Sequence, residues 1–499
     1  MNKNCLGKIN RNLEKVNFSA PRIVIGGTNS GTGKTTITCA ILMALKKRGY
    51  NLCSFKCGPD YIDPMFHRKV LGIPATNLDL FFTDKETTLW IMKKAYEAEN
   101  VGSSKDSDKK IAVMEGVMGY YDGVAGTTSI ASTYDLAKAT QSPAILLVDG
   151  KGKSLSLLAE IKGFLEFKQN SNIKGVIINR ISGSMYGLLK DMIREQLGVE
   201  PLGYFPVMSD VCLESRHLGL VTADEIEDLE HILDLLASKA EETLEIDKIL
   251  ELAGGAEDLE FNKSKNVLCF EHEKEKLKDK MLREEGPQKI RIGVARDEAF
   301  CFYYNENLKM LEELGCQLVE FSPLRDNCLP RNLDGIILGG GYPELYGKIL
   351  EENLTMREDI LAALDKGMPC VAECGGFMYL HEGLLDREDN VYKMVGALEG
   401  KCFPLEKMGR FGYINLEFNR ENFLGDKETH VKGHEFHYWE SENTGDFLHA
   451  QKPLRKKNWQ CVVDKKNIFA GFPHLYFWSN PEIPSNLVVK CLEFNKKNR

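Results

Sequence analysis

The residues best placed to do chemistry begin with a glycine-rich run at residues 23–36, IVIGGTNSGTGKTT. An apolar, β-branched stretch leads into glycines, whose backbone N–H groups can converge on phosphate oxygens at the start of a helix. We expect Lys34 to reach the β- and γ-phosphates of a nucleotide and the Thr35 hydroxyl to bind Mg²⁺. The strict pattern would have a glycine at Thr28, whereas here it stands one residue earlier. The alternative is a glycine-rich turn that binds no nucleotide. The predicted phosphate-binding residues are Gly31, Thr32, Gly33, Lys34, Thr35 and Thr36.

Charged side chains follow two further predicted strands. Lys56, Asp60 and Asp63 lie in FKCGPDYIDP, and Glu115 and Asp122 lie in MEGVMGYYDG. Ligands of open α/β sheets bind beyond the carboxyl ends of the strands. Mg²⁺ needs only a few oxygen ligands besides phosphates, so the remaining carboxylates could hold a second substrate. Lys56 could stabilise a phosphoryl group in transfer. The alternative is that the acids are solvated or form turns and that the lysine is exposed.

Three further residues are weaker candidates. Asn179 ends another predicted strand and could meet the base or the phosphates of a nucleotide. Arg216 and His217, in ESRHLGL, could bind carboxylates, although a single histidine in such a stretch is as often structural.

A second constellation stands in the C-terminal half. LGGGYPE at residues 338–344 follows a predicted strand and offers backbone N–H groups for an oxyanion hole. Cys374 stands between a strand and a helix and precedes two glycines, an arrangement that exposes a nucleophile and in which the helix N-terminus favours the thiolate. His474, in FPHLYF, is the candidate base. The alternative is that Cys374 is a small buried residue.

The run GHEFHY at residues 433–438 alternates polar and aromatic residues as a strand does. His434 and His437 are close enough in sequence to suggest a metal site. Because further histidine or acidic partners are missing, we favour a structural or interdomain role.

The elements that must position these residues alternate between short apolar strands and helical stretches, which is typical of doubly wound parallel sheets. The charged run EHEKEKLKDKMLREEGP indicates an exposed linker that is helical in part, after which the α/β pattern restarts. We therefore expect two doubly wound α/β domains. The expected divisions are an N-terminal extension at 1–20, a P-loop domain at 21–270, a charged linker at 271–288 and a second domain at 289–499. The predicted strands are 23–27, 52–56, 111–115, 144–149, 175–179, 289–295, 335–338 and 369–372.

Composition narrows the function classes. Of 499 residues 43% are hydrophobic and 27% charged, a soluble globular profile, and the net charge of −9 argues against binding nucleic acid or an anionic membrane. The longest apolar runs are strand-sized, and the first residues lack the apolar core of a signal peptide. The 14 cysteines are scattered without a C-x-x-C pair, which favours a reducing cytoplasm.

Together these stretches resemble the cobyrinic acid a,c-diamide synthases, in which a dethiobiotin-synthetase-like P-loop domain is fused to a flavodoxin-like class I glutamine amidotransferase domain. GPDYIDP joined to MEGVMGYYDG is the specific part, and the resemblance spans roughly residues 22–480. The matching stretches are GTNSGTGKTT, FKCGPDYIDP, MEGVMGYYDG, ESRHLGL, LGGGYPE, ECGGFMYL, GHEFHY and PHLYFWS.

The resemblance implies an ATP- and glutamine-dependent amidation of two carboxylates on a corrinoid, in cobalamin biosynthesis, with Mg²⁺ as cofactor and a homodimer left open. Glutamine would give a thioester and ammonia, and ATP would convert a substrate carboxylate into an acyl phosphate. Many class I amidotransferases carry a glutamate two residues after the histidine, where this chain has Tyr476, and the family that the chain resembles generally lacks this glutamate too. The roles that carry over are catalysis for Cys374, His474, Lys56, Asp63 and Asp122; Mg²⁺ binding for Thr35, Asp60 and Glu115; substrate binding for Tyr61, Ile62, Arg216 and His217; and the oxyanion hole for Gly340, Gly341 and Gly375.

Two alternatives stay open. One is a P-loop regulatory or partitioning ATPase whose C-terminal half is a non-catalytic binding module. The other keeps the chemistry and changes the macrocycle to hydrogenobyrinic acid or nickel sirohydrochlorin.

Overall fold

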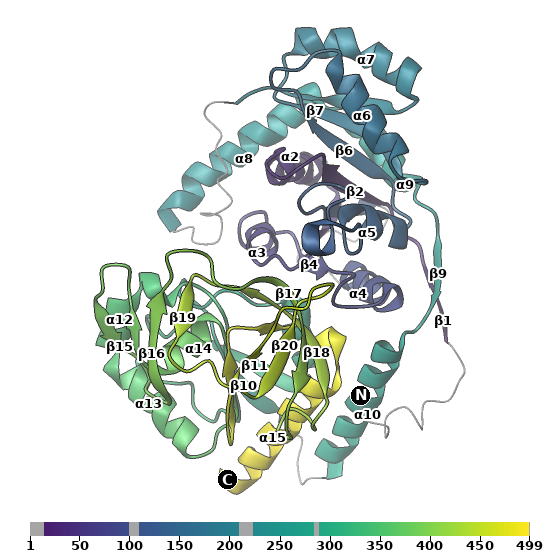
Figure 1. Cartoon of the computed structure of the whole chain (residues 1–499). Helices are drawn as coiled ribbons and strands as arrows, with labels where there is room; N and C mark the ends of the chain where they lie inside the picture. Colours follow the sequence, from purple (N-terminus) through teal and green to yellow (C-terminus); the bar gives the residue numbers. More distant parts are fainter. Residues whose placement is uncertain (1–13, 99–108, 209–222, 284–288, 499) are drawn as a thin grey trace. The chain divides into compact units, whose positions relative to one another are not determined.

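The computed structural model describes residues 14–98, 109–208, 223–283 and 289–498, and the side chains of residues 223–228 and 283 are left out (Figure 1). The chain divides into two compact units between Lys263 and Ser264. This division precedes the charged run in which we expected a linker. None of the described helices is long and apolar enough to cross a membrane.

The first unit is built on a seven-stranded sheet in the order β4-β3-β5-β2-β6-β7-β8, and every neighbouring pair is parallel. The predicted strand 144–149 is matched exactly, the other four predicted strands are one or two residues longer, and β4 and β8 were not predicted. The strands are β2 (Arg22–Gly27), β3 (Asn51–Cys57), β4 (Ala75–Leu78), β5 (Lys110–Glu115), β6 (Ala144–Asp149), β7 (Ile173–Asn179) and β8 (Glu200–Phe205).

Helices cover both faces of this sheet. Ile23 and Ile25 of β2 pack in one apolar core with buried residues of α2, α8 and α9. On the opposite face, a Cβ on Gly26 would lie 3.1 Å from a methyl group of Thr133 in α5. The doubly wound prediction is therefore confirmed for this unit. The helices are α2 (Lys34–Lys47), α3 (Ile62–Lys69), α4 (Lys85–Glu97), η2 (Val124–Gly126), α5 (Thr133–Ala139), α6 (Ser156–Glu166), α7 (Gly183–Leu197), α8 (Ala223–Thr243) and α9 (Ile246–Gly254).

A two-stranded ribbon completes the first unit. β1 (Lys15–Phe18) pairs antiparallel with β9 (Leu259–Asn262), so part of the predicted N-terminal extension is a strand of this unit. Val16 and Phe18 are buried, which is why the segment adheres to the unit instead of extending from it.

The second unit contains a six-stranded sheet in the order β11-β10-β12-β13-β23-β22. Its pairs are parallel except for the antiparallel edge strand β22. The unit's α/β elements are β10 (Ile290–Ala295), α11 (Asn305–Glu313), β11 (Cys316–Phe321), β12 (Gly335–Leu338), η3 (Pro343–Leu345), α12 (Gly347–Glu352), α13 (Leu354–Asp365), β13 (Cys370–Glu373), α14 (Gly375–Leu380), β22 (Val463–Lys465), β23 (Ile468–Gly471), η4 (Phe477–Ser479) and α15 (Glu482–Asn498).

Two smaller sheets, which we did not predict, are formed by strands between β13 and β22 in the chain together with β24, which follows β23. Their orders are β15-β14-β16-β19 and β21-β20-β17-β18-β24. Only the alternation in GHEFHY indicated a strand there, and most of it lies in β18, as predicted. These strands are β14 (His381–Leu385), β15 (Val391–Lys393), β16 (Leu398–Pro404), β17 (Phe411–Phe418), β18 (His430–Phe436), β19 (Trp439–Ser441), β20 (Leu448–Gln451), β21 (Asn458–Cys461) and β24 (His474–Leu475).

The charged run predicted as a linker is largely helical. Its residues up to 283 belong to α10 (Lys265–Arg283), at the start of the second unit. Phe270, Glu273 and Leu277 are buried at helical spacing, and the Glu273 carboxylate accepts a hydrogen bond from the Ser485 hydroxyl of α15 at 2.6 Å. A few apolar residues on one face therefore anchor a helix whose other faces are charged.

Candidate active sites

The phosphate loop joins β2 to α2. Gly31 and Gly33 have left-handed φ angles of 79° and 88°, which favour glycine. The Nζ of Lys34 donates to the Asn29 carbonyl at 3.0 Å, and the Thr32 hydroxyl donates to the same oxygen at 3.1 Å. Burial and the positive charge of Lys56 lower the pKa of Lys34 to about 8. The loop thus has the backbone that phosphate binding requires.

Asn179 braces this loop from β7. Its Nδ2 donates to the Thr32 carbonyl at 2.7 Å, and its Oδ1 accepts from the Arg180 backbone N–H at 2.9 Å. A Cβ on Gly33 would lie 2.4 Å from that Nδ2, so only glycine fits there. Arg180 in turn pairs with Asp149 at 2.6 Å. The side-chain amide of Asn179 therefore stabilises the conformation of the phosphate loop.

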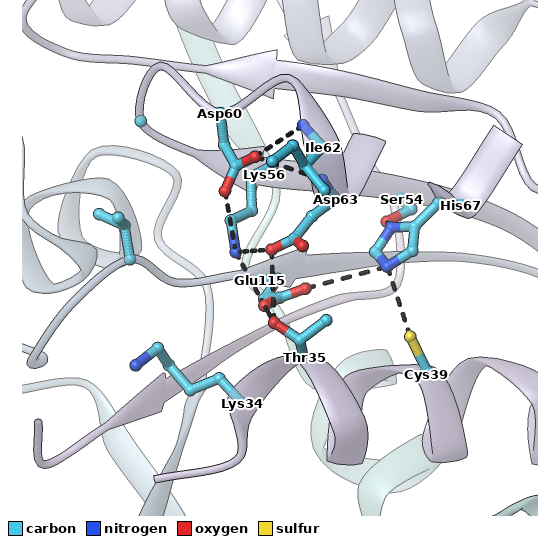
Figure 2. A network of polar contacts seen from close by, with 12 residues as sticks. Lys34, Thr35, Cys39, Ser54, Lys56, Asp60, Ile62, Asp63, His67 and Glu115 are labelled. Carbon is cyan, nitrogen blue, oxygen red and sulfur yellow. Dashed lines mark hydrogen bonds and ion pairs between the residues drawn. The ribbon is translucent and has the colours of Figure 1, made fainter. Parts of the chain in front are cut away.

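Five of the predicted residues meet in one buried network (Figure 2). The Nζ of Lys56 donates to Asp63 Oδ2 at 2.5 Å and to Glu115 Oε1 at 2.8 Å, and lies 3.8 Å from Asp60 Oδ2. The Thr35 hydroxyl, on the phosphate loop, donates to Glu115 Oε1 at 2.7 Å. Parallel pairing of β3 with β5 sets Lys56 directly opposite Glu115, which is why motifs distant in sequence converge.

Three carboxylates surround this one buried lysine. Burial raises the pKa of Glu115 to about 7 and that of Asp60 to about 6. Burial acts in the same direction on Asp63, but the charge and hydrogen bond of Lys56 outweigh it and lower that pKa. The cluster therefore holds more negative than positive groups, and added positive charge would stabilise its ionised form.

The donor set fits a hard divalent cation. On the phosphate loop, the Thr35 hydroxyl lies 2.7 Å from Glu115 Oε1 and 3.3 Å from Asp63 Oδ2, so hydroxyl and carboxylate oxygens gather at one point. Across those residues, no group of three or more His, Cys, Asp or Glu side chains forms a metal site by itself. A cation here would need phosphate oxygens or water as its remaining ligands, as Mg²⁺ does in nucleotide sites.

The other predicted residues of this unit have local roles in the structure. Asp60 Oδ1 accepts from the backbone N–H groups of Ile62 and Asp63 and so caps the start of α3, where Tyr61 and Ile62 are half-buried. Asp122 Oδ2 accepts from the Gly119 N–H at 2.9 Å within its own turn. The predicted residues Arg216 and His217 lie outside the described residues.

In the second unit, Cys374 stands between β13 and α14. Its φ of 47° and ψ of −101° are unusual for a residue with a side chain and are held by the surrounding fold. A Cβ on Gly340 would lie 3.0 Å from His474 Nε2 and 3.4 Å from Cys374 Cβ, so the thiol and the imidazole both approach this glycine. The Gly341 nitrogen would lie 3.0 Å from a Cβ on Gly375. The structure thus brings together the predicted nucleophile, base and glycines.

Glu373, which we did not predict as a site residue, lies beside His474 and would form an ion pair with its protonated ring. Its Oε2 lies 3.6 Å from His474 Nδ1, and its Oε1 accepts from the Leu475 N–H at 2.9 Å. Tyr476, two residues after His474, instead donates its hydroxyl proton to Glu306 Oε1 at 3.2 Å. The only signal in the sequence was that Glu373 immediately precedes Cys374 at the end of a strand.

The pKa of the Cys374 thiol differs from our expectation. Burial raises the pKa of Cys374, and the negative charges of Glu344, Glu373 and Glu435 act in the same direction. The Gly375 backbone at the start of α14 acts in the predicted direction and lowers the pKa of the thiol, but burial outweighs this contribution.

His434 and His437 serve the packing of the second unit. His434 pairs with His474 between β18 and β24. His437 bonds the Trp439 carbonyl through Nδ1 at 2.6 Å and stacks on Phe472, with the ring centroids 4.0 Å apart. These contacts support the structural role that we favoured.

Comparison with known proteins agrees with this architecture. Residues 23–220 match the CobQ/CobB/MinD/ParA nucleotide binding domain, and residues 291–482 match the CobB/CobQ-like glutamine amidotransferase domain. A cobyrinate a,c-diamide synthase of Caldanaerobacter subterraneus subsp. tengcongensis is 37% identical, covering 95% of this chain and 99% of the relative. One from Priestia megaterium is 35% identical, covering 97% and 99%. The solved PurLQS from Thermotoga maritima aligns with 42% of this chain and 99% of its own, at 14% identity and a TM-score of 0.30. The chain belongs to the cobyrinate a,c-diamide synthase family.

Proposed function

We propose that this protein converts the a- and c-acetate carboxylates of cobyrinic acid into amides, using ATP and glutamine. The observation that carries the proposal is the bond from Thr35 of the phosphate loop to Glu115, which shares Lys56 with Asp63. This network unites nucleotide-binding groups with charged groups suited to activate a carboxylate. The relatives named for cobyrinate support the substrate class.

In the first unit, a substrate carboxylate oxygen attacks the γ-phosphorus of ATP and ADP leaves. Lys34 and Lys56 stabilise the phosphoryl oxygens during this transfer. Thr35 and Glu115, with Asp60 nearby, would hold Mg²⁺, which neutralises phosphate charge when bound. Ammonia then attacks the acyl carbon and phosphate leaves. Activation is necessary because a free carboxylate offers ammonia no good leaving group.

In the second unit, the buried Cys374 thiol gives its proton to His474 Nε2 as sulfur attacks the amide carbon of glutamine. Backbone N–H groups around Gly340, Gly341 and Gly375 receive the oxyanion. The protonated imidazole gives the proton to departing ammonia, and water then hydrolyses the thioester. Because the thiol pKa is raised, proton transfer must accompany attack, and Glu373 stabilises the imidazolium that forms.

We place the macrocycle against Tyr61 and Ile62, with Asp63 and Asp122 beside the reacting carboxyl and Arg216 and His217 binding its other carboxylates. Cobyrinic acid is favoured over hydrogenobyrinic acid and nickel sirohydrochlorin because the relatives are named for it. The cytoplasm is the proposed compartment, and the cysteines of the described residues are all free thiols, as reducing conditions require.

The deciding experiment incubates the protein with each of the three macrocycles, ATP, Mg²⁺ and glutamine, and counts the new amides by mass spectrometry. We expect two amides on cobyrinic acid. Lys34→Ala should abolish amidation with glutamine or ammonium salts and leave glutamine hydrolysis measurable. Phosphate release that needs neither a macrocycle nor glutamine, without amide formation, would instead favour a regulatory ATPase.

A further inference from the structure

A second row of polar side chains lies behind the carboxylate cluster, away from the phosphate loop (Figure 2). Ser54 of β3, His67 of α3 and Cys39 of α2 are all fully buried. His67 Nδ1 lies 2.8 Å from the Ser54 Oγ, and its Nε2 lies 3.7 Å from the Cys39 Sγ and 3.9 Å from Glu115 Oε2. The proposed function assigns no task to this row.

The two oxygens of Glu115 are in unequal surroundings. Oε1 accepts hydrogen bonds from Thr35 and Lys56, whereas Oε2 has no hydrogen-bond partner within the described residues. A buried carboxylate oxygen without a donor is costly. The His67 ring nitrogen at 3.9 Å is too distant for a hydrogen bond, but a shift of less than about 1 Å would form one.

The neighbours of His67 select one tautomer of its neutral ring. A neutral imidazole carries one N–H. Nε2 faces the Cys39 sulfur and the Glu115 oxygen, both of which can accept a proton, and the carboxylate would repel a lone pair on Nε2. The Ser54 hydroxyl can donate to Nδ1, and in the described residues its side chain bonds only His67. Ser54 as donor therefore leaves the ring proton on Nε2, directed at Glu115.

We propose that His67 is a positioning residue for Glu115. Ser54 holds the imidazole with its proton on Nε2, and this N–H keeps the carboxylate oriented so that Oε1 meets Thr35 and Lys56 beside the phosphate loop. His67 touches neither nucleotide nor macrocycle in this scheme. The inference rests on the proposed function, because it assigns Glu115 to the binding of Mg²⁺ and ATP.

Two variants of His67 separate this role from simple packing. A glutamine side chain can place its amide N–H near the position of His67 Nε2, whereas asparagine reaches only the position of Nδ1. We expect His67→Asn to raise the Mg²⁺ concentration for half-maximal ammonia-dependent amidation about 10- to 100-fold, as loss of an outer-shell partner does. His67→Gln should stay within a few-fold of the wild type. Cys39→Ala, which removes the other neighbour of Nε2, is the matched control and should leave this value unchanged.

A second measurement needs neither metal nor substrate. Nitrogen-15 NMR of ring-labelled histidines in the metal-free, full-length protein reports which ring nitrogen carries the proton, and His67→Gln identifies the His67 signals by their loss. We expect the proton on Nε2 in the wild type and a mixture of tautomers in Ser54→Ala.

The outcomes are distinct. A proton on Nδ1 in the wild type overturns the inference, even if His67→Asn does not fold. The inference is also overturned if His67→Asn needs the same Mg²⁺ concentration as the wild type for half-maximal amidation. It is overturned as well if His67→Gln raises that concentration as much as His67→Asn does. A wild-type protein that amidates none of the macrocycles would refute the proposed function, while the tautomer measurement would still decide the placement of the His67 proton.

Discussion

Neutralising Glu373 is the sharpest test of the second active site. Glu373→Gln keeps an acceptor for the Leu475 N–H, which the carboxylate binds at 2.9 Å, so the backbone around the histidine should be retained. What it removes is the negative charge 3.6 Å from His474 Nδ1. The substitution therefore separates charge from geometry.

The size of the effect follows from that distance. Two unit charges 3.6 Å apart attract by roughly 4–5 kcal/mol at the effective dielectric constant of about 20 that suits protein sites. The glutamine dipole and reorganisation recover part of this, and hydrogen bonds to charged groups contribute about 1.5–3 kcal/mol net. We expect a loss of about 2–3 kcal/mol of transition-state stabilisation, which slows glutamine hydrolysis roughly 30- to 150-fold.

One assay measures glutamate release from glutamine, and a second measures amidation with ammonium salts. In Glu373→Gln the second rate should equal that of the wild type. Tyr476→Phe is the matched control, because it alters a buried residue two positions after His474 but removes only a hydroxyl directed at Glu306. Its glutaminase rate should change less than about threefold, because the hydroxyl that it removes is directed at Glu306 and not at the imidazole. Unchanged glutamate release in Glu373→Gln, or a larger loss in Tyr476→Phe, would refute the assignment.

Three other perturbations follow from the structure. Cys374→Ala should abolish glutamine-dependent amidation and leave ammonia-dependent amidation intact, and loss of both in a folded variant would contradict separate sites. Asp63→Asn and Asp122→Asn should let a monoamide accumulate in a product time course, whereas near wild-type kinetics would mean that these residues only shape turns. Burial raises the pKa of Glu435 from 4.5 to about 7, so the folded state binds this proton more tightly than the unfolded chain between those pH values. The free energy of unfolding should therefore fall as pH rises through that window. Denaturant unfolding at pH 5 and at pH 8 measures this fall, and Glu435→Gln should make it smaller by up to about 3 kcal/mol. The exposed control Glu399→Gln should show no such difference.

Much of the first site could be predicted from local sequence. Residues 144–149 and 335–338 form strands with the predicted bounds, because short β-branched runs between polar residues have few other stable arrangements. Parallel strands bring their carboxyl ends to one edge of the sheet, so Lys56 and Glu115 could be placed near the phosphate loop without knowing any distance. The residue types and their order along the chain thus determined the fold class and the phosphate-binding chemistry.

Only the tertiary structure decided how these groups pair and how far burial shifts their pKa values. It made Glu373 the partner of His474 and turned Tyr476 toward Glu306, because through-space neighbours depend on strand order, which spacing does not encode. It also buried Cys374 deeply enough to raise the pKa of its thiol, which outweighs the opposite effect of the Gly375 backbone at the start of α14. Local sequence determines which groups are available, whereas burial and distance, which set their energies, arise only when distant segments pack together.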